Sequence, residues 1–297
     1  MSEETRVSEK KHKDRLFLFL FGQEEHKDWT LSLYNAVNHS NYTDPEEIEF
    51  NTIKEALYLG MHNDVSFLIA DEVNLYEHQS TYNPNMPLRQ MQYLAGMYEA
   101  YLKKHKLNKY GRTQIILPVP HLIVFYNGLQ EMDNEVTLRL SDAFPSERRE
   151  ESDVEVTVHM LNINLEHNRE FLAKCRPLFE YSWLVETTRQ FKSKYDDDAF
   201  DEAIKIMPLD FMIRERILAH REEVKTMLLT EYDEKESREL FRLEGQREGE
   251  KIGEEKATFN YIQNLMRKKN YSAQEAMDAL DLSPEDQEKY LQLLKNQ

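Results

Sequence analysis

The sequence predicts an α/β protein with a mixed central sheet flanked by helices, followed by an all-helical C-terminal extension. Two short apolar, β-branched runs joined by a polar link occupy residues 65–79, which is typical of a β-hairpin. Residues 121–126 (HLIVFY) are apolar on both faces, as in a central strand covered by helices on each side. Beyond Leu165 the apolar residues recur at helical spacing.

The length of 297 residues fits one large domain with a smaller partner. We expect an α/β domain over residues 12–230, a charged connecting helix over 231–256 and a small helical module over 257–297. The 14 Phe and 16 Tyr residues can fill a core, which excludes a disordered chain.

The composition also restricts partners and compartment. A formal charge of −17 argues against a general nucleic-acid coat, because it repels phosphates, but it allows a local basic surface. The single cysteine, Cys175, excludes an internal disulfide and is expected to be a small buried apolar residue. No apolar run approaches the ~18 residues that span a bilayer. We therefore expect a soluble, cytoplasmic protein without a membrane partner.

The chain before the hairpin is predicted to begin with helices. Residues 14–21 and 29–37 have helical spacing, and Asp28 is placed to cap the second helix. A loop rich in Asn, Asp and Pro follows over residues 38–47. Strands are then expected at residues 48–53 and 56–61.

In the hairpin, side chains alternate between the two faces of the strands. Glu77 and Gln79 therefore share one face, and Tyr76 and His78 take the other. Antiparallel pairing brings the start of the first strand beside the end of the second, so Asp64 is expected near Glu77. Two carboxylates at one sheet edge suit a hard divalent cation such as Mg²⁺. Equally, polar residues at the end of a solvated strand need no function.

A helix is predicted over residues 88–102, after a rigid turn over 82–87. Its apolar stripe is expected to face the core, and consists of Met91, Leu94, Tyr98 and Leu102. Residues 87–112 also carry one acid, Glu99, against six bases: Arg89, Lys103, Lys104, Lys106, Lys109 and Arg112. This contrast indicates either a phosphate-facing surface or a solvated helix end.

The buried strand at residues 121–126 ends in an Asn127-Gly128 turn. Residues 136–140 and 154–163 alternate like more peripheral strands, with a charged insert between them. His159 and His167 have no second ligand at metal spacing, and we expect them to be ordinary structural or surface histidines.

Helices are predicted at residues 165–175, 178–194, 200–206 and 209–229. The run Asp196-Asp197-Asp198 lacks the Gly and Glu of a calcium loop and is expected to be the solvated start of a helix.

The C-terminal part is expected to be entirely helical. The connecting helix carries glycines at spacing four, Gly245, Gly249 and Gly253. These favour either close packing with a partner helix or a flexible hinge. Ser272 and Ser283 are good N-caps in the last module. A module of this size is marginal alone, which favours docking or a homodimer through the C-terminal helices.

Three segments of the chain resemble the Rpn family of recombination-promoting nucleases and transposases, in the PD-(D/E)XK nuclease superfamily. They are KDRLFLFLFG (13–22), NDVSFLI…NLYEHQSTYNPNMPLR (63–89) and LPVPHLIVFYNG (117–128). The resemblance covers roughly the first two-thirds of the chain and implies a restriction-endonuclease-like core. One residue departs from the superfamily pattern, because Gln79 stands where a lysine is usual.

The resemblance implies a Mg²⁺-dependent DNA endonuclease, with Mn²⁺ as a substitute, associated with recombination or transposition. Asp64 and Glu77, with the backbone carbonyl of His78, would hold the metal, and Gln79 would orient the water or a phosphate oxygen. Asp14 would support the site, or else simply start a helix favourably. The predicted DNA-backbone contacts are Arg89, Lys103, Lys104, Lys106 and Lys109. The alternative is a catalytically weakened nuclease fold acting as a DNA-binding or protein-interaction module.

Overall fold

A computed structural model describes residues 15–50, 65–229, 257–269 and 271–282, together with residues 286, 287, 290, 291 and 294. The chain divides into two compact units, residues 1–235 and 236–297. Each is described by itself below. The predicted strand at 56–61, the cap at Ser283 and the three glycines of the connecting helix lie outside the described residues.

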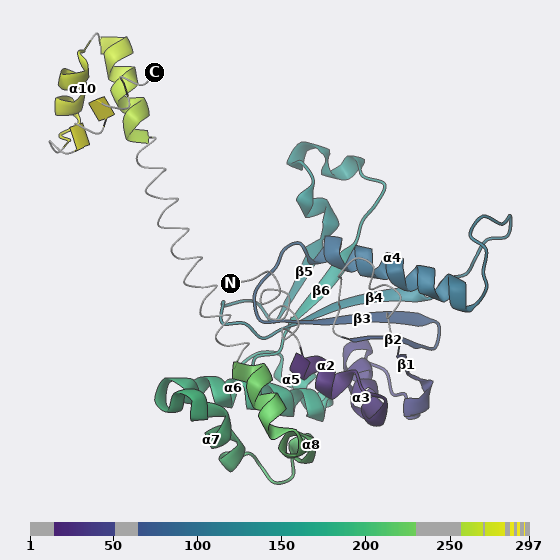
Figure 1. Cartoon of the computed structure of the whole chain (residues 1–297). Helices are drawn as coiled ribbons and strands as arrows, with labels where there is room; N and C mark the ends of the chain where they lie inside the picture. The colour runs from purple at the N-terminus through teal and green to yellow at the C-terminus, as the bar shows by residue number, and fades with distance from the viewer. Residues whose placement is uncertain are drawn as a thin grey trace, which may run out of the picture. The chain divides into compact units, whose positions relative to one another are not determined.

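Within the described residues of the first unit, the strands form a six-stranded sheet in the order β1-β2-β3-β4-β6-β5 (Figure 1). The strands are β1 (Glu49–Phe50), β2 (Val65–Ile69), β3 (Glu72–Gln79), β4 (Val119–Tyr126), β5 (Glu135–Arg139) and β6 (Thr157–Asn162). The predicted hairpin is confirmed, and its two-residue turn places Ala70 in the left-handed region, at φ 50°. The strand predicted over residues 154–163 is observed as β6, which is shorter at both ends.

The sheet is mixed, as predicted. β1, β2 and β3 are antiparallel, β3, β4 and β6 are parallel, and β5 is antiparallel to β6. The carboxyl ends of the three parallel strands therefore meet at one edge, at Gln79, Tyr126 and Asn162.

Helices cover both faces of this sheet (Figure 1). One face carries α4 (Met86–Lys104). The other carries α2 (Arg15–Phe21), α3 (Lys27–Asn38), α5 (Arg169–Lys174), α6 (Arg176–Tyr195), α7 (Ala199–Ile206) and α8 (Arg214–Ala219).

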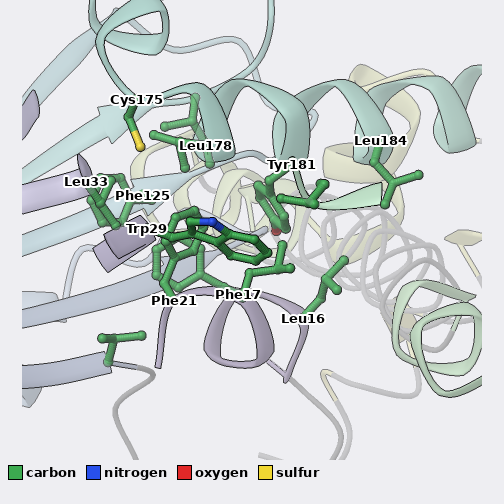
Figure 2. Close-up of a cluster of buried hydrophobic side chains, with 14 of the residues drawn as sticks. Leu16, Phe17, Phe21, Trp29, Leu33, Phe125, Cys175, Leu178, Tyr181 and Leu184 are labelled. Atoms are coloured by element: carbon green, nitrogen blue, oxygen red, sulfur yellow. The ribbon is translucent and has the colours of Figure 1, made fainter. Parts of the chain in front are cut away.

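Strand β4 shows why two cores form. Leu122, Val124 and Tyr126 pack with α4, whereas Ile123 and Phe125 pack with the helices of the opposite face. The prediction of a central strand buried on both faces is confirmed. Figure 2 shows the second core, in which aromatic rings of α2 lie between the sheet and α6.

One prediction about a helix end is wrong, and one about a helix face is confirmed only in part. Asp28 does not cap α3, because a 3₁₀ turn over Glu24–His26 leads into the helix and leaves Asp28 within its first turn. Of the predicted stripe, Leu94 and Tyr98 pack half-buried against the core, but the fully buried residues of α4 are others: Met86, Pro87, Gln90, Tyr93 and Met97. The polar residue Gln90 conceals this face in the sequence, because its amide is buried and donates to the Ile123 carbonyl at 3.3 Å.

The single helix predicted over 209–229 is also wrong. α8 ends at Ala219, and helix resumes over residues 221–229 after a break at His220. Before α8, the fully buried carboxylate of Glu180 accepts the Ile213 N–H at 3.0 Å and the Arg176 Nε–H at 2.7 Å. This side chain anchors the irregular segment that precedes α8. The run Asp196–Asp198 is an exposed 3₁₀ turn leading into α7, as expected.

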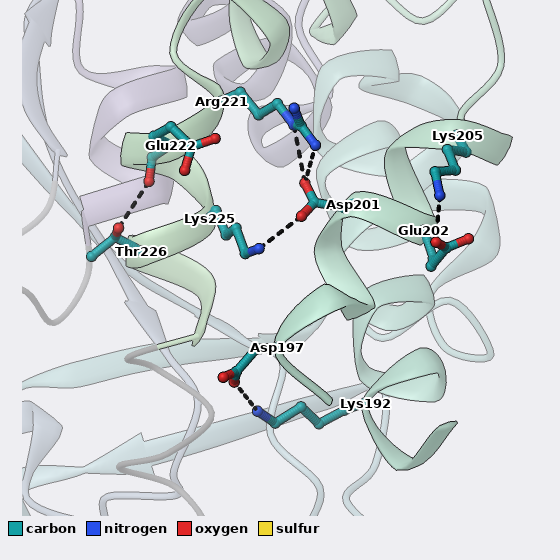
Figure 3. A network of polar contacts seen from close by, with 9 residues as sticks. All are labelled: Lys192, Asp197, Asp201, Glu202, Lys205, Arg221, Glu222, Lys225 and Thr226. Atoms are coloured by element: carbon teal, nitrogen blue, oxygen red, sulfur yellow. Dashed lines mark hydrogen bonds and ion pairs between the residues drawn. The ribbon is translucent and has the colours of Figure 1, made fainter. Parts of the chain in front are cut away.

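A charged cluster fastens α7 to the helix after α8 (Figure 3). Asp201 accepts from Arg221 at 2.6 and 3.0 Å and from Lys225 at 2.7 Å, with 16% of its side chain exposed. Burial opposes ionisation of Asp201, but the hydrogen bonds from Lys225 and Arg221 outweigh it, and its pKa is lowered.

Because the folded pKa of Asp201 lies below the unfolded value, the charged carboxylate stabilises the fold above about pH 4, the unfolded pKa. This contribution is lost as pH falls through the folded pKa. We expect Asp201→Asn to lower the free energy of unfolding at pH 7 by about 1–2 kcal/mol. The difference from the wild type should shrink below about pH 4, as measured by urea unfolding.

The adjacent Glu202→Gln is the matched control for this prediction. Glu202 pairs with Lys205, whose side chain is 66% exposed, so removing that charge should change stability by less than about 0.5 kcal/mol. An Asp201→Asn penalty that stays constant down to pH 3 would contradict the assignment.

In the second unit, residues 257–269 are helical and α10 (Ala273–Ala279) begins with a capping box between Ser272 and Glu275, which confirms the predicted cap. A small core joins these helices and includes Ile262, Met277 and Tyr290. Within the described ranges of either unit, no helix is long and apolar enough to cross a membrane.

Candidate active site at the carboxyl end of strand β3

Glu77 and Gln79 lie side by side near the end of β3, on the face covered by α4. Both are buried, with 2% and 8% of their surface exposed. The Gln79 amide donates to Met86 Sδ at 2.8 Å and lies 3.4 Å from Glu77 Oε1. The shared face predicted from strand alternation is confirmed.

Arg89, one turn into α4, contacts this pair directly. Its Nη2 lies 2.5 Å from Glu77 Oε1 and 3.2 Å from the Tyr93 hydroxyl, and its Nη1 lies 3.4 Å from Met86 Sδ. The Glu77 side chain is 3% exposed, whereas that of Arg89 is 36% exposed. The guanidinium therefore offsets the cost of burying a carboxylate while remaining within reach of solvent.

His78 points to the opposite face of the sheet. Its Nε2 lies 2.9 Å from the Tyr181 hydroxyl, and its ring stacks on Phe17 at 5.7 Å between centroids. The His78 side chain thus anchors β3 to α2 and α6. The sequence analysis suggested only the backbone carbonyl of His78 as a metal ligand, and the position of the side chain does not bear on that suggestion.

The turn after β4 supports the end of β3. The Asn127 N–H donates to the Gln79 carbonyl at 3.0 Å. A Cβ on Gly128 would lie 2.3 Å from the Tyr126 hydroxyl and 2.5 Å from the Ser80 carbonyl oxygen. Only glycine fits here, because a side chain would push the backbone that follows Gln79 out of place.

The residues present fit a hard cation in part. Glu77 supplies a carboxylate, and Gln79 Oε1 is buried without a hydrogen-bond partner in the described part of the chain. Both are oxygen donors of the type that Mg²⁺ prefers. Asp14 and Asp64 lie outside the described residues, and the described ranges contain no group of three His, Cys, Asp or Glu that could hold a metal.

The predicted basic set is divided between the two ends of α4. Arg89 lies beside Glu77, whereas Lys103 lies about 21 Å further along the helix axis, at 1.5 Å per residue. Lys104 pairs with Glu49, and Lys109 pairs with Glu99 at 2.6 Å. The lysines therefore lie toward the opposite end of the sheet from Glu77 and Gln79.

The remaining candidate groups have structural surroundings. His159 Nδ1 lies 3.3 Å from Glu135, and His167 Nδ1 lies 2.9 Å from Asn134. Cys175 is fully buried, and burial raises the pKa of its thiol to about 11, which disfavours the reactive thiolate. Its predicted buried position is confirmed.

The contact between Arg89 and Glu77 is the feature of the site that the sequence did not predict. A usable signal was present, since the Glu77 face of β3 must be covered and the next helix starts shortly after Gln79. A cation one turn into that helix falls above the carboxylate. Comparison with protein-family models, with curated proteins and with solved structures finds no match for this chain.

Proposed function

We propose that the chain is a Mg²⁺-dependent DNA endonuclease with a PD-(D/E)XK-like core, active in the cytoplasm in recombination or transposition. The observation that carries the proposal is the buried Glu77 beside Gln79 at the carboxyl end of β3. The hairpin register, with Val65 opposite Tyr76, and the helices on both faces of a mixed sheet support it.

In this proposal Asp64 and Glu77 would hold the metal, together with the His78 carbonyl, and Asp14 would support them. Mg²⁺ held there would supply Lewis acidity and a water of lowered pKa. Gln79 orients that water or a non-bridging phosphate oxygen through its amide. The DNA backbone is contacted, without reading of the base sequence, by Arg89, Lys103, Lys104, Lys106 and Lys109.

A plasmid-nicking assay on the purified full chain tests the proposal, with Mg²⁺, Mn²⁺ or EDTA. We expect metal-dependent nicking by the wild type, and its loss in Asp64→Ala and Glu77→Ala with the fold retained by circular dichroism. Asp64→Ala with full activity would refute the assignment.

A second function is supported by Gln79, which cannot supply the positive charge of the usual lysine. DNA binding without metal-dependent cutting by any variant would favour this alternative, a DNA-binding or protein-interaction module. A homodimer through the C-terminal helices is compatible with either function.

A further inference from the structure

The pairing of Arg89 with Glu77 bears on how the proposed metal site is controlled. Glu77 is the carboxylate proposed to bind the metal, and Arg89 is a positively charged group of the protein that already contacts it. The Arg89 guanidinium donates a charge-assisted hydrogen bond to Glu77, with Nη2 2.5 Å from Oε1. A divalent ion that takes Glu77 as a ligand must therefore compete with the guanidinium.

We propose that Arg89 is a built-in counter-ion that occupies Glu77 in the metal-free protein and is displaced when a divalent cation binds. The inference rests on the proposed function, because it concerns regulation of the same site. It also gives Arg89 two successive partners, Glu77 at rest and a substrate phosphate once the metal is bound.

The surroundings of Arg89 permit this exchange. Its side chain is 36% exposed, although Glu77 is almost fully buried, so the guanidinium can turn outward while the carboxylate stays. The Tyr93 hydroxyl, 3.2 Å from Nη2, and the Met86 sulfur, 3.4 Å from Nη1, are uncharged contacts that hold it only weakly. The contact with Glu77 is thus the charged contact that the metal would take over.

Gln79, which stands where the superfamily usually has a lysine, lies next to Arg89. The Gln79 amide and the Arg89 guanidinium both contact Met86 Sδ, at 2.8 and 3.4 Å, so they are immediate neighbours. Arg89 thereby places a positive charge beside the residue that lacks one. Arginine suits this role because its guanidinium stays charged at every physiological pH.

Metal binding without DNA tests the exchange. Mn²⁺ titrations of the EDTA-treated, dialysed full chain, followed calorimetrically, would compare the wild type with Arg89→Met and Arg89→Lys. We expect Arg89→Met to bind Mn²⁺ about ten-fold more tightly. The substitution removes the ion pair between a partly exposed guanidinium and a buried carboxylate, with which the metal must otherwise compete. Arg89→Lys should show a smaller change, because it keeps the charge but loses the planar fork.

Lys103→Met is the matched control, since it removes the same charge from the same helix. It lies about 21 Å from Arg89 along the axis, well beyond the ~10 Å screening length at 0.1 M salt. Its Mn²⁺ affinity should equal that of the wild type. If Arg89→Met and Lys103→Met both bound Mn²⁺ more tightly by the same factor, the effect would come from net charge alone, and the exchange would be overturned.

The outcomes separate this inference from the nuclease proposal. Unchanged or weaker Mn²⁺ binding by Arg89→Met, with plasmid cutting by the wild type, would overturn the exchange alone. Tighter binding by Arg89→Met, with no cutting by any variant, would support the exchange and overturn the nuclease. No Mn²⁺ binding by any variant would overturn both. If Arg89→Met fails to fold, an Arg89→Lys affinity equal to that of the wild type would overturn the exchange.

Discussion

Replacing Glu77 by glutamine is expected to abolish metal-dependent DNA cleavage while the protein stays folded. The substitution keeps the shape of a side chain that is 2% exposed and removes only its charge. Losing one anionic metal ligand should lower the cleavage rate by about a thousandfold or more, since a bound metal supplies several kcal/mol of transition-state stabilisation. The measurement is single-turnover cleavage of a labelled duplex, with folding checked by circular dichroism.

Glu72→Gln provides the control on the same strand. Glu72 lies at the opposite end of β3, where it accepts from the Tyr34 hydroxyl at 2.7 Å and lies 3.3 Å from His121 Nε2. It carries the same charge but no proposed catalytic role, so cleavage should be retained. Equal loss in both variants would point to general disruption of the strand instead of metal ligation.

Replacing Phe17 by alanine is expected to lower the free energy of unfolding of the first unit by about 3–5 kcal/mol, the usual cost of a large cavity. Phe17 is 1% exposed and contacts four rings, Phe21, His78, Phe125 and Tyr181, at centroid distances between 4.8 and 6.0 Å. No single neighbour can fill the vacated space, because these contacts come from α2, both central strands and α6.

The two tryptophans, Trp29 and Trp183, both belong to the first unit, so their fluorescence in urea follows its unfolding alone. Leu18→Ala on the same helix is the control, because Leu18 is 38% exposed. Its cost should stay near or below about 1 kcal/mol. Similar losses for both variants would mean that α2 contributes mainly its helical backbone instead of the Phe17 ring.

Most of the helices and strands could be predicted, because the spacing of apolar residues within each segment determines them. The alternation around Glu77 identified both the hairpin and the face shared with Gln79. The apolar run 121–126 identified a strand buried on both faces. Both inferences need only the period of a strand and a count of apolar residues.

The features that the sequence did not predict depend on contacts between distant segments. A buried polar residue, Gln90, concealed the inner face of α4, because its partner is a carbonyl of β4. The irregular segment before α8 is anchored at Ile213 by Glu180, more than thirty residues earlier in the chain. The pairing of Arg89 with Glu77 likewise depends on the crossing of α4 over β3, for which the sequence signal was the short connection after Gln79.

Under the proposed function, the division of basic residues along α4 would set a length scale for the bound nucleic acid. The helix extends about 27 Å from Met86 to Lys104 at 1.5 Å per residue. A duplex rises about 3.4 Å per base pair, so one lying along α4 would span about eight base pairs between the Glu77 end and the lysines. Fragments shorter than this would reach either the proposed cutting residues or the lysine end, and not both. Under the proposed function, the length of one helix would thus set the shortest DNA that contacts both groups.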